Sequence, residues 1–505
     1  MELIEADMDH EAKKGVGIRI TSDPEETRVH RQPEGEPERR VDHPLRLLLV
    51  ADLAPEQAAS DTHDVDANLF PVLLDRLAPR LEIEVENRLP SGPRLLDVQL
   101  AFRTLSDFKP SAVVRQVPEL QTRFPSEKAM TRAERGEPAE RGEPAERGEP
   151  TAREPRPPQR EESAPRESAD VLDRLLGMVE TGKSLSNEPS PERGRVSGRD
   201  TLAESLIEAA GKGLSGQRLP RDAGEAGPID GTISAQLDAI FSHPAFRSLE
   251  SSWRGLRFLV KRLGFRQNVR LEVLPVSKDE LERTFRERVF LPERRRDESE
   301  APLSAVILDF EFDNSLRDLA ALEQMAEMGA ELGVPVIAAA SPAFFAVRTP
   351  AGLEELPPLR QHLSGPGYLG WHKLRERREA QFLVLSVPRF LLREPYGAER
   401  PSEDVPFEES TALWGRSSLV MAALMGASFV EQGTSTRVSG EAPRLDGLSL
   451  WTHPRGAVPL AAVLPENRMA DFADAGFSVI GCTLNRDSVY LAHARTVGFG
   501  STSDA

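Results

Sequence analysis

Residues 382–414 read FLVLSVPRFLLREPYGAERPSEDVPFEESTALW, and the rest of the chain can be read outward from this stretch. Its opening part, 382–387, is apolar apart from one serine, which indicates a buried strand. Pro388 removes a backbone donor, so the strand should end or lie at a sheet edge there. Arg389 and Arg393 then flank an apolar trio. The stretch therefore predicts a buried strand that leads into a rigid, charged corner, with no nucleophile and no metal cage.

The charged corner continues through a turn and an acidic loop to Phe407–Glu409. We predict that four of its residues make contacts in an assembly: Arg389, Arg393, Glu408 and Glu409. The alternative is a corner of ion pairs inside one chain, and such pairs add little stability unless they are networked or buried. Charge reversal at Arg393 that left assembly intact would exclude the contact hypothesis.

Composition limits the class of protein. The chain has 505 residues and a formal charge of −18, with one cysteine, Cys482. The length allows about two to four domains, and the acidity disfavours nucleic-acid binding. One cysteine excludes an intrachain disulfide and a cysteine-based zinc site. There is no signal-peptide apolar region, and no apolar run reaches the roughly 18 residues that span a bilayer. We expect a cytoplasmic protein without membrane insertion.

Two phrases of this chain resemble a known family. LSVPRFLLREPYG, the FEE run after it and LWG at Leu413–Gly415 resemble the large (TssC-like) contractile-sheath subunit of the bacterial type VI secretion system. HPAFRSLESSWRGLRFLV at 243–260 resembles a second hallmark of that family. The resemblance implies a set of structural hallmark residues: Trp253, Arg254, Gly255, Pro388, Tyr396 and Trp414.

The residues of the second phrase predict a helix that starts at Pro244, a residue suited to a first turn. Its apolar positions form one broad face, on which Trp253 is expected to be a core anchor. Glu250 and Arg254 lie four residues apart, so we expect them to pair on the helix surface.

Residues 44–124 have the pattern of a small α/β unit. An apolar run at 45–50 predicts a buried strand, 69–77 carries a helical apolar stripe, and 81–86 and 96–102 alternate as half-buried strands. HPLRLLLVADLAP and LDVQLAFRTLSDFKPSAVVRQVPEL resemble the small (TssB-like) sheath subunit. The Asp-Phe-x-Pro signature of that family falls at Asp107, Phe108 and Pro110. From the residues alone, we expect Asp107 to be a helix N-cap.

The remaining segments are assigned by composition. Residues 1–43 are charged and lack periodicity, which predicts a disordered N-terminal arm. ERGEPA repeats within 125–168 predict a disordered Pro/Gly/Glu/Arg linker. In the small-subunit family a helical region follows the signature, so the small module here is truncated. The large-subunit-like domain is expected at 200–495, followed by a polar tail at 496–505.

Residues 169–181 interrupt the linker with an amphipathic pattern of about three helical turns. A helix this short needs a partner. It resembles the N-terminal helix of large sheath subunits, which in the family is read by the AAA+ unfoldase that recycles contracted sheaths. The resemblance implies recognition through Leu172, Leu175 and Leu176. The alternative is a helix that docks on its own domain.

Residues 270–341 alternate strand, helix, strand, helix, strand, which predicts a parallel or mixed sheet with right-handed crossovers. Four carboxylates crowd one strand end: Asp309, Glu311, Asp313 and Asp318. Such groups can bind a cation or transfer protons. Their spacing is not that of an EF-hand, and no P-loop, GxSxG, HExxH or dinucleotide motif is present. We expect no catalytic residue, no cofactor and no metal.

The combined prediction is an α/β (α+β mixed) fold, a sheath protomer with mixed sheets flanked by helices and two modules joined by a disordered linker. The resemblance implies a fused small and large subunit that forms a helical or ring homo-polymer around an inner tube. In the family such a sheath stands on a baseplate and contracts to drive effector delivery. One alternative is a sheath-derived accessory or binding protein that does not polymerise. Another is an α/β enzyme that uses the cluster around Asp309.

Overall fold

The computed structural model describes residues 43–55, 61–121, 231–297, 300–397, 405, 407–432 and 443–498. All of these described residues belong to one compact unit. The predicted linker and the 169–181 helix lie outside the described residues, as do 1–42, 200–230 and 499–505. No helix of the described part is long and apolar enough to cross a bilayer.

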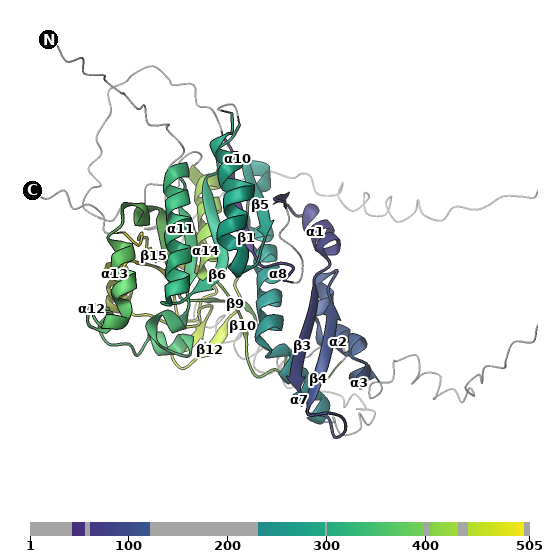
Figure 1. The fold of residues 1–505 in the computed structure, drawn as a ribbon. Helices are drawn as coiled ribbons and strands as arrows, with labels where there is room; N and C mark the ends of the chain where they lie inside the picture. The colour runs from purple at the N-terminus through teal and green to yellow at the C-terminus, as the bar shows by residue number, and fades with distance from the viewer. Residues whose placement is uncertain are drawn as a thin grey trace, which may run out of the picture. The chain divides into compact units, whose positions relative to one another are not determined.

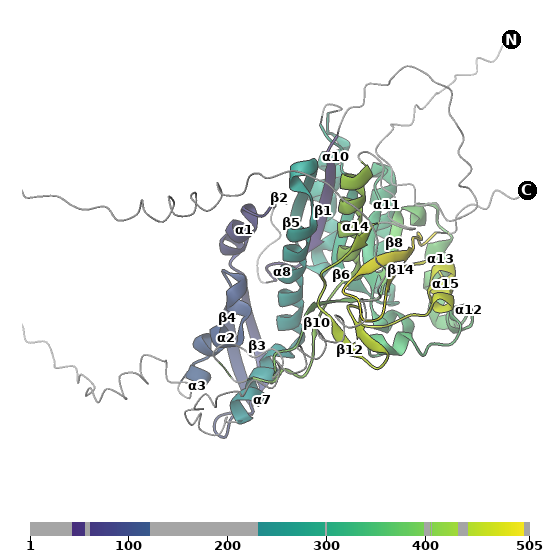
Figure 2. The same cartoon turned by 180° about the vertical axis from the view of Figure 1, so that it is seen from behind.

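A nine-stranded mixed sheet forms the centre of this unit (Figures 1 and 2). Its strands lie in the order β11 (Arg444–Leu445), β15 (Val489–His493), β14 (Phe477–Cys482), β8 (Leu383–Val387), β7 (Val336–Ala340), β6 (Ala305–Phe312), β1 (Leu45–Ala51), β5 (Val269–Pro275) and β2 (His63–Asp64). The strands from β14 to β5 pair in parallel, whereas β15, β11 and β2 are antiparallel to their neighbours. The prediction of a mixed sheet is confirmed.

Strand β1 joins the two predicted modules. It pairs with β5 from Leu45 opposite Val269 to Ala51 opposite Pro275. On its other side it pairs with β6. Its apolar run is almost fully buried, as expected for a central parallel strand with both faces covered. A strand of the small module therefore lies inside the sheet of the large module, an arrangement that the sequence pattern did not predict.

Helices cover both faces of the sheet. Leu48 and Val50 of β1 point into a core shared with the helices on one face: α9 (Leu281–Phe285), the π-helical turn η4 (Arg286–Phe290), α11 (Leu316–Leu332), α12 (Leu359–His362), α13 (Leu369–Arg375) and α15 (Glu466–Asp474). Leu47 and Leu49 point into a second core with α8 (Pro244–Arg262), α14 (Ser417–Gln432) and α7 (Gly231–Phe241). A short helix, α10 (Leu291–Arg294), follows η4. Period-two alternation along β1 thus serves two cores at once.

The remainder of the small module packs on α7 and α8. It consists of α1 (Leu69–Leu77), the hairpin β3 (Arg80–Glu86) and β4 (Leu95–Ala101), the turn η1 (Leu105–Phe108), α2 (Pro110–Gln116) and α3 (Pro118–Gln121). Each hairpin strand alternates exposed and buried residues along its whole length. Figure 1 shows the hairpin beside α7 and α8. The alternating strands predicted here are confirmed.

The hallmark stretch begins as β8, which ends before Pro388 as predicted. It continues as β9 (Phe390–Arg393), which pairs antiparallel with β10 (Leu413–Gly415). A further hairpin joins β12 (Trp451–His453) and β13 (Gly456–Val458). Strand β13 ends at Val458, because Pro459 lacks the donor that a continued ladder needs. Only an isolated bridge, Phe390 with Leu460, remains there.

Candidate assembly site

Arg393 lies at the centre of a buried ion-pair network. Its side chain is 1% exposed, and its guanidinium binds two carboxylates in bidentate fashion. Nε and Nη2 donate to Glu250 at 2.9 and 3.1 Å. Nη1 and Nη2 donate to Glu409 at 2.5 and 3.0 Å. Burial alone would lower the pKa of Arg393, but the carboxylates, Glu250 foremost, raise it above its ordinary value. The corner is held by charges that water does not reach.

Glu250 connects this network to α8. The expected pair with Arg254 forms, with Nε donating to Glu250 Oε1 at 2.6 Å. It is not a surface pair, because the Glu250 side chain is 1% exposed. Burial acts to raise the pKa of Glu250, but Arg393 and then Arg254 together lower it. The spacing of four residues predicted the partner but not the burial, since the second arginine comes from a distant strand.

Glu409 closes the acidic loop onto the turn that begins it. Its backbone N–H donates to the Tyr396 carbonyl at 2.8 Å, and its Oε2 accepts from the Tyr396 N–H at 3.1 Å. The Arg393 guanidinium carbon lies 4.4 Å from the Tyr396 ring centre. Phe407 packs on Phe241 of α7 with 5.0 Å between ring centres. The loop is therefore anchored at both ends on the α7–α8 corner.

The four predicted contact residues do not have equivalent positions. Arg393 and Glu409 form the buried corner inside the chain, which is the alternative raised from the sequence. Arg389 pairs with Glu311 on β6 through two guanidinium nitrogens. Glu408 has an exposed side chain, while its backbone N–H donates to Ser234 Oγ at 3.1 Å. Glu408 is thus the member of the set most available to a second molecule.

Sequence reasoning missed a third arginine, Arg416, which follows β10. Its Nη1 donates to Asp309 Oδ2 at 3.2 Å and contacts two serine hydroxyls of α8, while Nη2 reaches a third. Arg416 therefore ties the hallmark strand to both α8 and β6. Its place directly after the Leu-Trp-Gly phrase was the available signal.

Each of the crowded carboxylates has a local partner. Asp309 pairs with Arg416, Glu311 with Arg389, and Asp318 with Lys278 at 2.7 Å. Asp313 Oδ1 accepts the backbone N–H of Ser315, at the start of α11. Among the described residues, no group of three or more metal-ligating side chains forms a metal site. The arrangement is one of structural ion pairs and a helix start.

Asp52, at the end of β1, lies near the same cluster. Burial raises its pKa to about 6, the charge of Arg416 lowers it, and Asp279 raises it further. Burial likewise raises the pKa of Asp309, against the influence of Arg416. Arg416 is therefore shared between two carboxylates and only partly compensates for their loss of water.

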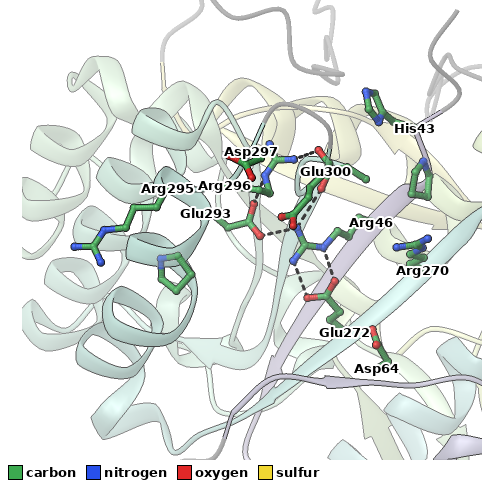
Figure 3. Close-up of a pocket in the computed structure, with 13 residues that line it drawn as sticks. His43, Arg46, Asp64, Arg270, Glu272, Glu293, Arg295, Arg296, Asp297 and Glu300 are labelled. Carbon is green, nitrogen blue, oxygen red and sulfur yellow. Dashed lines mark hydrogen bonds and ion pairs between the residues drawn. The ribbon is translucent and has the colours of Figure 1, made fainter.

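A polar cavity of about 780 Å³ opens elsewhere, at the amino ends of β1 and β5 (Figure 3). Arg46 extends into it, and its guanidinium binds Glu272 and Glu293. Arg296 also pairs with Glu293, at 3.1 Å. The lining of this cavity is mainly charged, with Arg46 and Arg296 paired to carboxylates within it, in contrast to the mostly apolar lining of ligand sites.

Two different family profiles match the chain, one over each of the two modules. The family profile VipB, described as "EvpB/VC_A0108, tail sheath N-terminal domain", matches residues 226–295 and 297–497, which is more than half of the chain. The profile T6SS_VipA, described as "Type VI secretion system, VipA, VC_A0107 or Hcp2", matches residues 27–130. The chain belongs to the type VI secretion sheath family. The resemblance predicted from the sequence is confirmed for both subunits.

Two curated relatives of this sheath protein come from Pseudomonas aeruginosa (strain PAO1). The sheath protein TssC1 is 30% identical over 341 residues, covering 61% of this chain and 68% of the relative. The sheath protein TssB1 is 32% identical over 90 residues, covering 16% of this chain and 52% of the relative. This chain thus spans about half the length of its small-subunit relative.

Solved sheath structures align more loosely. The contracted helical sheath of the anti-feeding prophage shares 14% identity at a TM-score of 0.26, over 49% of this chain and 52% of that one. The VipA-N2/VipB contracted sheath shares 26% identity at a TM-score of 0.13, over 26% of this chain and 88% of that one.

The hallmarks of the large sheath subunit are buried, except Arg254 and Trp414, which are partly exposed. Trp253 is fully buried, its Nε1 donates to the Leu53 carbonyl at 3.0 Å, and its ring meets Phe70 at 5.9 Å. A Cβ on Gly255 would lie 2.5 Å from Leu419 Cδ1, so α8 and α14 approach closely there. Trp414 packs against a second tryptophan with 6.0 Å between ring centres. These residues make packing contacts that hold the sheath fold together.

The signature of the small sheath subunit fixes a turn. Asp107 accepts the backbone N–H groups of Arg103 and Thr104 at 2.8 and 2.7 Å. The expectation of an N-cap was wrong: Asp107 is the third residue of η1 and reaches back to its start, where Thr104 is the cap. Phe108 is fully buried and Pro110 begins α2. The third predicted site, Leu172, Leu175 and Leu176, lies outside the described residues.

Proposed function

We propose that this chain is a fused small- and large-subunit sheath protomer of a type VI secretion system, which polymerises around an inner tube and contracts to drive effector delivery. The observation that carries the proposal is the position of β1, a strand from the small-subunit region paired between β5 and β6 of the large-subunit region. One chain thereby contains parts of both sheath subunits in a single sheet. Contraction needs two packings of rigid protomers and no active site.

The proposal extends to partners and place. An inner-tube protein would fill the sheath, a baseplate would start its assembly, and an AAA+ unfoldase would recycle it through Leu172, Leu175 and Leu176. The assembly would stand in the cytoplasm. Glu408 would contact a neighbouring protomer, since its side chain is exposed while its backbone is anchored on α7.

A structural role without catalysis is supported by the chemistry of the described residues. The carboxylates around Asp309 are engaged by Arg416, Arg389 and Lys278. Burial raises the pKa of the Cys482 thiol to about 11, so little nucleophilic thiolate forms at neutral pH. We therefore propose that the chain is not an enzyme. Asp309→Ala would impair folding and abolish no turnover.

One observation favours a second candidate, a sheath-derived accessory protein that does not polymerise. The small-subunit profile ends at residue 130, and the small-subunit relative is covered over only 52% of its length. Contacts that the missing region makes in the family would then be absent. This candidate predicts discrete particles in place of tubes.

Electron microscopy of the purified full chain distinguishes the two. The sample is imaged alone and after addition of an inner-tube protein, and its mass distribution is followed by sedimentation. Rings or tubes in either sample support the protomer. Uniform small particles in both, from a chain with a single cooperative unfolding transition, contradict it and support the accessory protein.

A further inference from the structure

The sheet of the large-subunit region is not complete without β1. If β1 were removed, β5 and β6 would stand about two strand spacings apart, roughly 9–10 Å. Both would then present unpaired N–H and C=O groups to each other inside the core, where such groups are rarely left without a partner. Leu47, Leu49 and Val50 are fully buried in this slot. The region from 231 to 498 must therefore take a strand from a small-subunit module.

Specific polar contacts join the small module to the large-subunit region, both at the slot and at the β3–β4 hairpin. Arg46 of β1 binds Glu272 on β5 and Glu293 on α10. Gln236 of α7 is fully buried and meets the end of β3 with both ends of its amide. Its Oε1 accepts from the Arg88 N–H at 2.7 Å, and its Nε2 donates to the Glu86 carbonyl at 3.2 Å. These contacts would be lost or left unpaired if the module shifted in register.

The apolar part of the same seam is continuous. Phe102 and Phe108 of the small module stack at 4.1 Å, and both meet Phe246 of α8 at 6.0 Å. One hydrophobic cluster runs from the β3–β4 hairpin through α8 to α14 without interruption. A seam of this kind resembles a core cut in two and is typical of permanent association.

We infer that the slot is filled in cis: each chain inserts its own β1 into its own sheet and needs no separate small subunit there. A module on the same chain acts at an effective concentration on the order of millimolar. A separate subunit at about micromolar concentration would be disfavoured by roughly a thousandfold for equal intrinsic affinity. In a sheath, pairing in cis would fix the stoichiometry at one small module for each large one. This consequence for assembly is the one part of the inference that rests on the proposed function.

An exposed ion pair across the seam supplies the test. Arg288 of η4 and Asp61 of the small module lie 2.8 Å apart, with side chains 50% and 77% exposed. In a Cys482→Ser background, the full chain carrying both Asp61→Cys and Arg288→Cys is treated with a short bis-maleimide. In parallel, two full chains with different tags are co-expressed, one carrying only Asp61→Cys and the other only Arg288→Cys.

Pairing in cis predicts a cross-link within the double variant, seen as a peptide pair in monomer-sized protein, and no covalent dimer from the co-expressed single variants. A dimer joining the two tags would overturn the inference, because the strand would then be exchanged between chains. Absence of both products would also overturn it, since the two positions would not be neighbours. The result is independent of whether tubes form, so a failure here and a failure of the proposed function are told apart.

Discussion

The buried Arg393 side chain connects β9, α8 and the acidic loop through its ion pairs with Glu250 and Glu409. Its guanidinium is fully enclosed, and Glu250 and Glu409 are enclosed with it. Burying charges costs free energy that only good geometry and full pairing repay. The pairing therefore has to be complete, and removing one member should cost far more than losing one surface ion pair.

We expect Arg393→Met to lower the free energy of unfolding by about 3–5 kcal/mol, because the buried Glu250 would keep only Arg254, and the buried Glu409 only Arg247 at 3.9 Å, in place of two bidentate contacts. The matched control is Arg389→Met, which removes a pair that remains partly exposed, with side chains 28% and 23% exposed. That control should cost about 1 kcal/mol or less. Urea denaturation of both variants measures the difference. Equal losses of unfolding free energy in the two variants would show that the buried Arg393 network stabilises the fold no more than the partly exposed Arg389 pair does.

Asp52 should make stability depend on pH. Its pKa is raised to about 6 in the folded chain, from an ordinary value of 3.8. The folded state therefore holds a proton that the unfolded state has lost, and stability should fall as pH rises between these values and through 6. Asp52→Asn should remove that loss and stabilise the protein at pH 7.5 by on the order of 1 kcal/mol, allowing for partial solvent screening.

Thermal unfolding of the Asp52→Asn variant between pH 5 and 7.5 measures this effect. The exposed Asp75→Asn on α1 is the control and should leave the pH profile unchanged. A wild-type profile that rises toward pH 7.5, or an Asn variant with the wild-type slope, would contradict the role given to Asp52.

At the scale of elements, the sequence pattern predicts where single strands and helices lie, because these depend on neighbouring residues in the chain. Apolar runs predicted β1 and β8, alternation predicted β3 and β4, and Pro244 predicted the start of α8. The partners of strands and of ion pairs could not be predicted from the sequence, because they join positions far apart in the chain. The sequence pattern singles out Arg393, but Glu250 stands 143 positions away, and its spacing from Arg254 alone predicts a surface residue. The insertion of β1 between β5 and β6 is of the same kind.

The contact of α8 with α14 is sensitive to a single methyl group. Gly255→Ala would place a Cβ 2.5 Å from Leu419 Cδ1, and Leu419 is fully buried. We expect a loss of about 1–3 kcal/mol from overpacking, although alanine is the better helix former. The additional change Leu419→Val should recover part of it. The control is Gly365→Ala, because a Cβ added to Gly365 would meet no heavy atom within 4 Å beyond its chain neighbours. A neutral Gly255→Ala variant would mean that the two helices can separate.

At the scale of the whole molecule, the remaining question is which surface meets the next protomer. Glu408 combines an exposed side chain with a backbone fixed on α7, so a contact there would require little ordering on assembly. Glu408→Lys should therefore leave the unfolding transition unchanged within about 0.5 kcal/mol. The same change should raise the protein concentration needed for assembly by about tenfold, equivalent to 1.4 kcal/mol per contact.

Sedimentation of assembled material over a concentration series measures this shift, and the exposed Glu355→Lys, which adds the same charge change elsewhere, is the control. An equal shift for both variants would point to net charge, since a long-range effect of charge does not distinguish the two positions and weakens with salt. A shift for Glu408→Lys alone, retained at high salt, would place residue 408 within a contact. No shift for either would remove Glu408 from the assembly surface and leave the corner around Arg393 with a role inside the protomer only.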